Sequence, residues 1–327
     1  MMGVDVDYSK QYFTIVSLED NNEIGWKHTF TISESRSLYV STDVGVGWTL
    51  KSSTSEGVTL GTLNRGQRLF IRTPYNSVSG YGDDYGYTYF TSTGNFAVEG
   101  NIMSLLYEDF DEQTALPNFS GSYAFDHMFY YCEKLINIDN LVMPATTLQP
   151  YCYQYMFCNC SALASLPAGL LPATTLADYC YKEMFDRCTS LTEIPEGFLP
   201  ATSLATQCYY CMFYDCSGIS SVPSDLLPAT TLNTGCYRTM FYGCTSLETA
   251  PDLLASTLVQ DCYRSMFYGC SSLNYIKCLA TNKSASNCTT GWVNGVAASG
   301  TFVKSSSTSW STGNSAIPSG WTVQNAS

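Results

Sequence analysis

A repeated block of about 28 residues dominates this chain and limits what it can fold into. The pair Met-Phe occurs six times, at intervals of 28 residues four times and then 26. The pairs begin at Met128, Met156, Met184, Met212, Met240 and Met266. A Cys follows each Phe by three residues, and in five blocks another Cys precedes the Met by four. Self-similarity at a fixed period is the signature of stacked repeat architectures, so it outweighs any single-residue signal.

One block shows how such a unit is expected to fold. In Cys180–Cys188 the apolar residues fall at positions i, i+4, i+5 and i+8, which indicates one face of a short helix or 3₁₀ turn. Leu191 and Ile194 indicate a short strand, and Leu199–Leu204 a second extended segment. Such a unit cannot bury its apolar side alone. The copies are therefore predicted to stack as a solenoid, with strands that pair in parallel between rungs.

The repeat resembles a variant of the BspA-like leucine-rich repeat family over residues 120–280. The matching strings are Cys-Tyr-x-x-Met-Phe-x-x-Cys, followed by Thr/Ser-Ser-Leu, and Leu-Pro-Ala-Thr-Thr-Leu between units. The layout is also similar to that of proteins from gut anaerobic bacteria and their phages, through Gly100–Leu106 and Ile317–Val323. The resemblance implies a right-handed leucine-rich-repeat solenoid, surface display and adhesion, and no catalytic residues. Bacterial surface members of the family normally carry a secretion leader.

The segment before the repeats has a different pattern. Its expected strands are Tyr12–Val16, Lys27–Ile32, Ser37–Thr42, Gly47–Lys51 and Arg68–Arg72. Turn residues separate them at regular spacing, which favours an antiparallel β-sandwich. Residues 100–110 are expected to form a short helix whose Ile102, Leu105 and Leu106 seal the first rung, because an uncapped stack exposes its core.

These patterns predict a mainly β protein with short helices, in four segments. The segments are an N-terminal β-sandwich domain over residues 1–99, a cap over 100–123, the repeats over 124–277 and a C-terminal cap over 278–327. The apolar plugs expected in the C-terminal cap are Trp292, Phe302, Trp310 and Trp321.

Composition and charge narrow the classes of partner. Charged residues make up 13% of the chain, and aromatic residues 14%, a composition that favours short strands and turns over surface helices. Fifteen basic residues stand against 28 acidic ones, and the net charge of −13 would repel nucleic acid. Met1–Asp7 has neither a basic start nor an apolar run, so no signal peptide is predicted. No stretch is long and apolar enough for membrane insertion.

Fifteen cysteines leave three interpretations open. The Cys-x7-Cys spacing does not match the ligand spacing of zinc fingers or ribbons. Disulfides between neighbouring rungs are sterically possible. The favoured interpretation is a column of buried free thiols, because an unpaired Cys packs as a small apolar side chain. Persistent thiols suit assembly in a reducing cytoplasm.

The sequence contains almost none of the residue patterns that are typical of catalytic sites. Its only histidines are His28 and His127, and His127 occupies a repeat position that varies between units, which suggests a surface residue. No Gly-Lys pair is present, so there is no phosphate-binding loop of the Gly-Lys-Ser/Thr type. Gly57–Gly61 has nucleophile-elbow spacing without the strand-turn-helix context. The chain is expected to be no enzyme and to need no cofactor or metal.

Two regions are candidate binding surfaces. The first is the Tyr- and Gly-rich stretch from residue 75 to 90, whose composition is typical of adaptable binding loops. Its candidate contacts are Tyr75, Tyr81, Tyr85, Tyr87 and Tyr89. Asp83 and Asp84 are an alternative calcium site, and a plain hairpin without ligand is the third interpretation. The second region is the variable pair in each repeat, with candidate contacts Tyr155, Lys182, Arg238 and Arg264.

We therefore expect a non-catalytic recognition or adhesion protein that contacts a glycan or protein at a cell surface. One setting is a phage virion, as a fibre, tail or capsid-decoration component that also contacts other virion proteins or further copies of itself. The alternative setting is a bacterial cell-surface adhesin. A glycan hydrolase is a more distant alternative.

Overall fold

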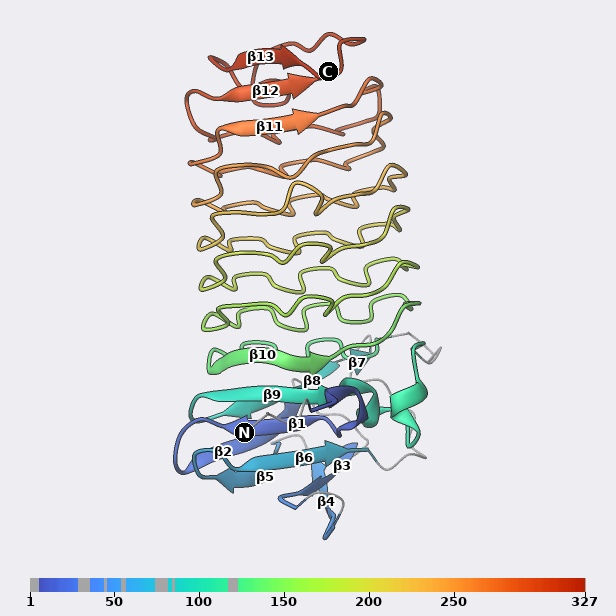
Figure 1. The fold of residues 1–327 in the computed structure, drawn as a ribbon, viewed down its shortest axis with the longest axis vertical. Coiled ribbons are helices and arrows are strands. Elements are labelled where there is room, and N and C mark those ends of the chain that lie inside the picture. Colours follow the sequence, from blue (N-terminus) through green and yellow to red (C-terminus); the bar gives the residue numbers. More distant parts are fainter. Residues whose placement is uncertain are drawn as a thin grey trace.

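The chain forms one elongated molecule in which turns of the repeats stack along the long axis (Figure 1). This computed structural model describes residues 6–28, 36–43, 46–53, 57–73, 82–83, 86–116 and 123–326. Within these residues the protein is mainly β with almost no helix, which confirms the predicted class. The helices of the described residues are three 3₁₀ segments, η1 (Tyr8–Lys10), η2 (Ile102–Leu105) and η3 (Phe110–Glu112).

Two sheets form the N-terminal end of the molecule. The six-stranded sheet has the order β10 (Leu135–Val142), β9 (Phe96–Asn101), β1 (Thr14–Ser17), β6 (Arg68–Arg72), β3 (Arg36–Ser41) and β4 (Thr49–Ser53). The four-stranded sheet has the order β5 (Val58–Leu63), β2 (Asn22–His28), β8 (Gly86–Ser92) and β7 (Gly82–Asp83). Phe13, Ile15, Trp26 and Phe90 are buried in their shared core.

Four of the five expected N-terminal strands correspond to β1, β3, β4 and β6, with shifted ends in all but β6. The expected strand Lys27–Ile32 shares only its first two residues with β2, and its residues 29–32 lie outside the described residues. Three N-terminal strands that are longer than β7, namely β5, β8 and β9, were not expected. Gly61 lies inside β5 and Gly57 directly before it, and they obscured this strand because glycine is unfavourable in strands. β8 includes the last five residues, 86–90, of the stretch interpreted as a binding loop, and it pairs antiparallel with β2.

The repeats contain consecutive turns where a helix or 3₁₀ turn was expected. Single residues, in most repeats every fourth one, take left-handed backbone conformations, with φ of 61° at Tyr179, 56° at Glu183 and 55° at Arg187. The Tyr155 N–H donates to the Lys182 carbonyl of the next rung (2.9 Å), whereas the Met156 N–H donates back to Tyr153 within its rung (3.3 Å). The helix prediction was wrong because a helix pairs its backbone N–H and C=O groups within itself, which would leave none of them to form hydrogen bonds between rungs.

Parallel bridges join other parts of neighbouring rungs. Single bridges link Thr147 with Thr175, Glu193 with Ser221, and Ser203 with Thr231. These contacts agree with the predicted parallel pairing, although most of the expected strands are reduced to one bridge per rung.

The inward side chains form columns along the stack. Phe129, Phe157 and Phe185 lie with ring centroids 5.3 and 5.4 Å apart and planes within 2° of parallel. The Cys188 thiol donates to the carbonyl oxygen of Phe157 in the previous rung (3.2 Å), and the same bond recurs at Cys160, Cys216, Cys244 and Cys270. The repeated Cys is therefore both a core residue and a link between rungs. All fifteen cysteines are buried free thiols in this structure.

Strand β8 serves as the rung that precedes the first repeat. The Phe90 ring stacks on Phe129 at 5.6 Å, and the Phe90 N–H donates to the Met128 carbonyl (2.9 Å). The Cys132 thiol donates to the Phe90 carbonyl (2.9 Å), as later thiols do to the previous rung. Alongside, β10 pairs in parallel with β9.

The segment from residue 100 to 110 forms the 3₁₀ turn η2 in place of the expected longer helix. Ile102 and Leu105 are fully buried, and Leu106 is half-buried. η2 contacts β6 of the six-stranded sheet. The residues expected to seal the first rung therefore lie in the core, while β8 and β9 cover the rung itself.

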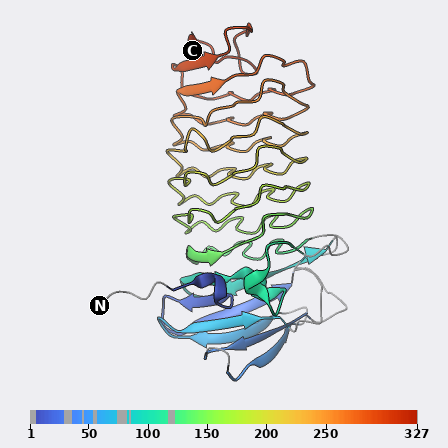
Figure 2. The same ribbon diagram turned by 45° about the vertical axis from the view of Figure 1, so that its right-hand side comes forward.

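A parallel sheet ends the stack at the C-terminus (Figure 2). Its strands are β11 (Tyr275–Cys278), β12 (Thr301–Lys304) and β13 (Thr322–Asn325). A second buried column, of tyrosines, runs from Tyr153 to Tyr263. Trp292 lies at the end of both the Phe and the Tyr column, 6.1 Å from Tyr263 and 6.4 Å from Phe267. Trp310 stacks on Trp292 at 5.7 Å, and Phe302 and Trp321 are buried nearby.

Burial predicts how the cysteines react. Desolvation raises the pKa of thiols such as Cys180 to about 12, so the reactive thiolate is scarce and shielded at neutral pH. We expect a charged thiol reagent to leave the native chain almost unmodified, and to titrate all fifteen thiols after denaturation without reductant. The exposed variant Ser190→Cys provides the control for reagent access. A denatured count below fifteen would contradict the free-thiol structure.

Candidate functional site

The variable pairs of the repeats lie on one wall of the stack. Each pair stands between a buried Cys-Tyr and a buried Met-Phe. Lys182, Glu183, Tyr210 and Arg238 are half-buried, whereas the sequence suggested fully exposed positions. The difference arises because each outward side chain packs against its counterpart on the next rung.

Six of the residues on this wall and on β8 form a continuous series of contacts. The Tyr87 and His127 rings stack at 3.6 Å, and His127 stacks on Tyr155 at 4.5 Å. The Lys182 ammonium lies 5.1 Å from the Tyr155 ring centre and 5.7 Å from that of Tyr210. The guanidinium of Arg238 lies 5.4 Å from the Tyr210 ring. We call Tyr87, His127, Tyr155, Lys182, Tyr210 and Arg238 the aromatic-basic stripe.

Three further tyrosines border the β8 end of the stripe. Tyr89 lies 6.1 Å from Tyr87, and Tyr130 meets Tyr87 edge-on at 5.3 Å. Tyr131 packs against Tyr130 and keeps 54% of its surface exposed. This end of the stripe therefore offers contact area from both the sheets and the first repeat.

Two residues of the stripe were not predicted from the sequence, namely Tyr210, which contacts Lys182 and Arg238, and His127. His127 was interpreted as a variable surface position, but only 9% of it is exposed, and its Nδ1 lies 2.7 Å from Asp126 Oδ1. Its ring joins Tyr87 of β8 to Tyr155 of the next repeat. The signal available in the sequence was Tyr155 itself, which occupies the same repeat position 28 residues later.

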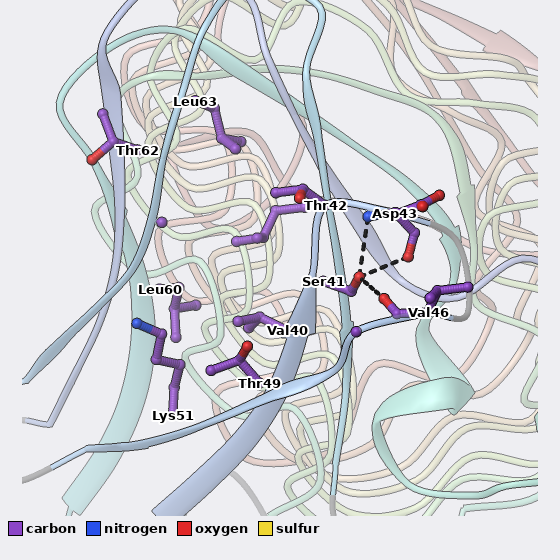
Figure 3. A pocket seen from close by; sticks show the side chains of 13 residues that line it. Val40, Ser41, Thr42, Asp43, Val46, Thr49, Lys51, Leu60, Thr62 and Leu63 are labelled. Carbon is purple, nitrogen blue, oxygen red and sulfur yellow. Dashed lines mark hydrogen bonds between the residues drawn. The ribbon is translucent and has the colours of Figure 1, made fainter.

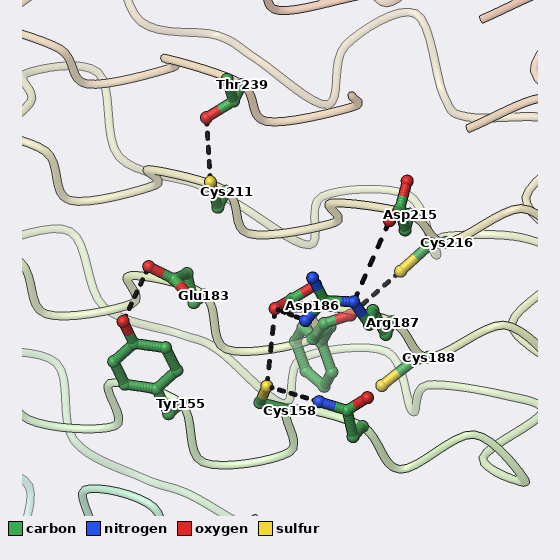
Figure 4. A network of polar contacts seen from close by, with 12 residues as sticks. Tyr155, Cys158, Glu183, Asp186, Arg187, Cys188, Cys211, Asp215, Cys216 and Thr239 are labelled. Atoms are coloured by element: carbon green, nitrogen blue, oxygen red, sulfur yellow. Dashed lines mark hydrogen bonds and ion pairs between the residues drawn. The ribbon is translucent and has the colours of Figure 1, made fainter. Parts of the chain in front are cut away.

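A network of polar contacts joins Tyr155 of the stripe and residues of the neighbouring rungs (Figure 4). The Tyr155 hydroxyl donates to Glu183 (2.9 Å) and accepts from Lys182 Nζ (3.2 Å). Asp186 accepts from the Cys158 thiol (3.5 Å) and from Arg187 (3.0 Å). These bonds hold neighbouring rungs in a fixed arrangement.

Burial sets the protonation states of the tyrosine and aspartate side chains on this wall. Desolvation raises the pKa of Tyr210 to about 12 and holds that of Tyr155 well above its ordinary value, so both phenols stay neutral donors. Desolvation also raises the pKa of Asp186 to about 7, a shift that Arg187 opposes and Glu183 increases.

The described carboxylates on this wall have structural partners. The Asp186 side chain is 5% exposed and is bonded to Cys158 and Arg187. Among the residues that the structure describes, no three His, Cys, Asp or Glu side chains are grouped as a metal site requires. The stripe presents ring faces, hydroxyls and cations that a ligand could contact.

The remaining predicted contacts are distributed as follows. Tyr75, Tyr81, Asp84 and Tyr85 lie outside the described residues, and Asp83 ends strand β7. The structure brings together Tyr87, Tyr155, Lys182 and Arg238 within the stripe, with Tyr89 at its border. Arg264 follows Arg238 on the next rung and pairs with Asp261 (3.3 Å).

Two cavities bordered by described residues of the N-terminal sheets lie away from the stripe. One of about 430 Å³ lies between β3, β4 and β5 (Figure 3). The Ser41 hydroxyl in its wall lies 2.7 Å from the Asp43 carbonyl and 2.6 Å from that of Val46, so this hydroxyl is committed to its own loop. The other, of about 310 Å³, is bordered by the Arg68–Glu99 ion pair (2.7 Å).

No protein family, curated protein or solved structure matches this chain. In the described part of the chain, no helix has the length and apolar character of a transmembrane span.

The buried Asp186 predicts a pH dependence of stability. Its pKa rises from 3.8 to about 7 on folding, so the folded state holds the proton more tightly. The free energy of unfolding should therefore fall as pH rises through this interval. Asp126 and Asp215 have pKa values raised by burial and act in the same direction. We expect Asp186→Asn to show a shallower slope than the wild type in urea unfolding between about pH 4 and about pH 7.

The exposed Asp225 provides the matched control for this experiment. Asp225→Asn should leave the wild-type slope unchanged. If Asp186→Asn also retained that slope, the assigned titration of Asp186 would be wrong.

Proposed function

We propose that this chain is a non-catalytic recognition protein that binds a glycan or protein of a cell surface through the aromatic-basic stripe. In this proposal the repeats form a right-handed leucine-rich-repeat solenoid of the BspA-like kind, and the N-terminal sheets form an antiparallel β-sandwich. The proposal rests on one observation: the unbroken contact series from Tyr87 to Arg238 across β8 and the repeats.

The composition of the stripe supports recognition. Tyrosine provides a large contact area with few rotatable bonds, and tyrosine and arginine are enriched where binding energy concentrates. The rings also lie beside Lys182 and Arg238, so apolar and charged contacts are available to the same ligand. The hydrogen bonds of Tyr155 to Glu183 and Lys182 fix these side chains in advance, which lowers the entropy lost on binding.

The preferred setting is a phage virion, as a fibre, tail or capsid-decoration component. Fifteen buried thiols support assembly in a reducing cytoplasm, where virions are built. A bacterial surface adhesin is the alternative setting for the same binding surface. A glycan hydrolase is less well supported, because Asp186, the strongly shifted carboxylate of this wall, is buried and already bonded.

The binding role is testable with the full-length chain. We expect the labelled wild-type protein to bind fixed cells of at least one strain in a panel of gut anaerobes, measured by flow cytometry. Tyr210→Ala should weaken this binding about 10-fold or more, because it removes a central aromatic contact. The matched control is Tyr242→Ala, in a separate tyrosine ladder where Tyr242 stacks on Tyr214 and Tyr268.

Thermal unfolding of both variants separates binding from folding. If both variants were equally stable and lost cell binding to the same extent, the stripe would not be the binding surface. Absence of cell binding by the wild type would also count against the proposed function of the stripe. Release of sugars from the bound cells would instead favour the hydrolase.

The setting predicts where the native protein resides. An antiserum should detect it at fixed stoichiometry in gradient-purified virions, and not in washed cell envelopes of the same culture. Detection confined to the envelopes would overturn the virion setting and favour the adhesin.

A further inference from the structure

Arg238 differs from the neighbouring cations of the repeats in its lack of an acidic partner. Lys182 lies 3.5 Å from Glu183, Arg187 lies 3.0 Å from Asp186, and Arg264 lies 3.3 Å from Asp261. Among the described residues, no carboxylate is within ion-pair distance of Arg238. Its guanidinium instead contacts the Tyr210 ring.

One atom of this guanidinium is buried without a hydrogen-bond acceptor. Arg238 Nε has no partner among the described residues, whereas most buried polar groups in proteins have one. An arginine guanidinium is a planar fork that matches the two oxygens of a carboxylate or sulfate. Contact with Tyr210 restricts the plane of this fork, so Arg238 is held in place before any ligand binds.

The surroundings of Arg238 favour an anion. Arg264 occupies the same position on the next rung, where its carbonyl accepts from the Thr239 N–H (2.9 Å). Lys182 lies on the opposite side of Tyr210 along the stripe. Because Glu183 and Asp261 pair with Lys182 and Arg264, Arg238 is the cation of this column whose charge no described carboxylate compensates, in a chain whose net charge is −13. Such a local excess of positive charge attracts an acidic ligand that the rest of the surface repels.

We infer that Arg238 is the specificity-determining residue of the stripe, and that the ligand is an acidic glycan. Arg238 would bind a sugar carboxylate or sulfate bidentately, while the apolar face of the sugar ring packs against Tyr210. This inference rests on the proposed function of the stripe. It adds the chemical class of the ligand.

The test uses the full-length chain and polysaccharides of defined charge. The probes are polygalacturonate for carboxylate, dextran sulfate for sulfate and neutral dextran as the uncharged reference, compared by affinity gel electrophoresis. We expect the wild type to bind one or both acidic polymers and not dextran. Arg238→Gln should weaken that binding about 10-fold or more, because a charged hydrogen bond is lost. Arg238→Lys, which keeps the charge without the fork, should bind at an intermediate level.

Lys277→Gln is the matched control, because it removes one positive charge from a residue paired with Asp252 outside the stripe. If Lys277→Gln lost as much binding to the acidic polymers as Arg238→Gln, the binding would reflect general charge attraction, and the inference would be overturned. Equal binding of dextran and the acidic polymers, or wild-type binding by Arg238→Gln, would also overturn it. If the acidic polymers do not bind but Tyr210→Ala still reduces cell binding, the ligand class is wrong and the proposed function stands. If neither cells nor polymers bind, both fail.

Discussion

The hydrogen bond from every second residue of one rung to the next holds this structure together. It is accompanied by left-handed backbone conformations at regular positions, every fourth residue in most repeats, such as Glu183 and Arg187. Each non-glycine residue in that conformation costs about 1–2 kcal/mol, so the arrangement persists only where other interactions offset the cost. Here the offset comes from the bonds between rungs and from the buried columns of Phe, Tyr and Cys, which an isolated repeat cannot form.

The same constraint explains why the stack needs specific ends. An unfinished rung exposes both backbone groups and the faces of its aromatic rings. At the N-terminal end, β8 supplies a backbone N–H, a carbonyl and the Phe90 ring to the first repeat. At the C-terminal end, Trp292 covers two aromatic columns and Trp310 covers Trp292. The candidate site follows from this arrangement, because β8 also places Tyr87 against His127.

Much of the repeat region could be predicted from its period. Positions that are always Cys, Met or Phe had to face inward, since identical side chains stack well at a fixed spacing. The local backbone could not be predicted in the same way. The spacing of apolar residues in Cys180–Cys188 fits a helix. The segment is not helical because alternate backbone N–H groups form hydrogen bonds to the next rung in place of the bonds that a helix would form within the rung. Glycines at 57 and 61 similarly obscured β5, which its pairing with β2 stabilises.

The sequence by itself determined that the repeats stack, which residues fill the core, and which pairs face outward, because all three follow from a period repeated in one chain. Only the tertiary structure decided that these pairs join β8 in one stripe. Tyr87 and His127 are 40 residues apart and belong to no common repeat. Their contact depends on the pairing of β8 with β2 and on its bonds to the first rung, and these are long-range interactions that no local pattern encodes.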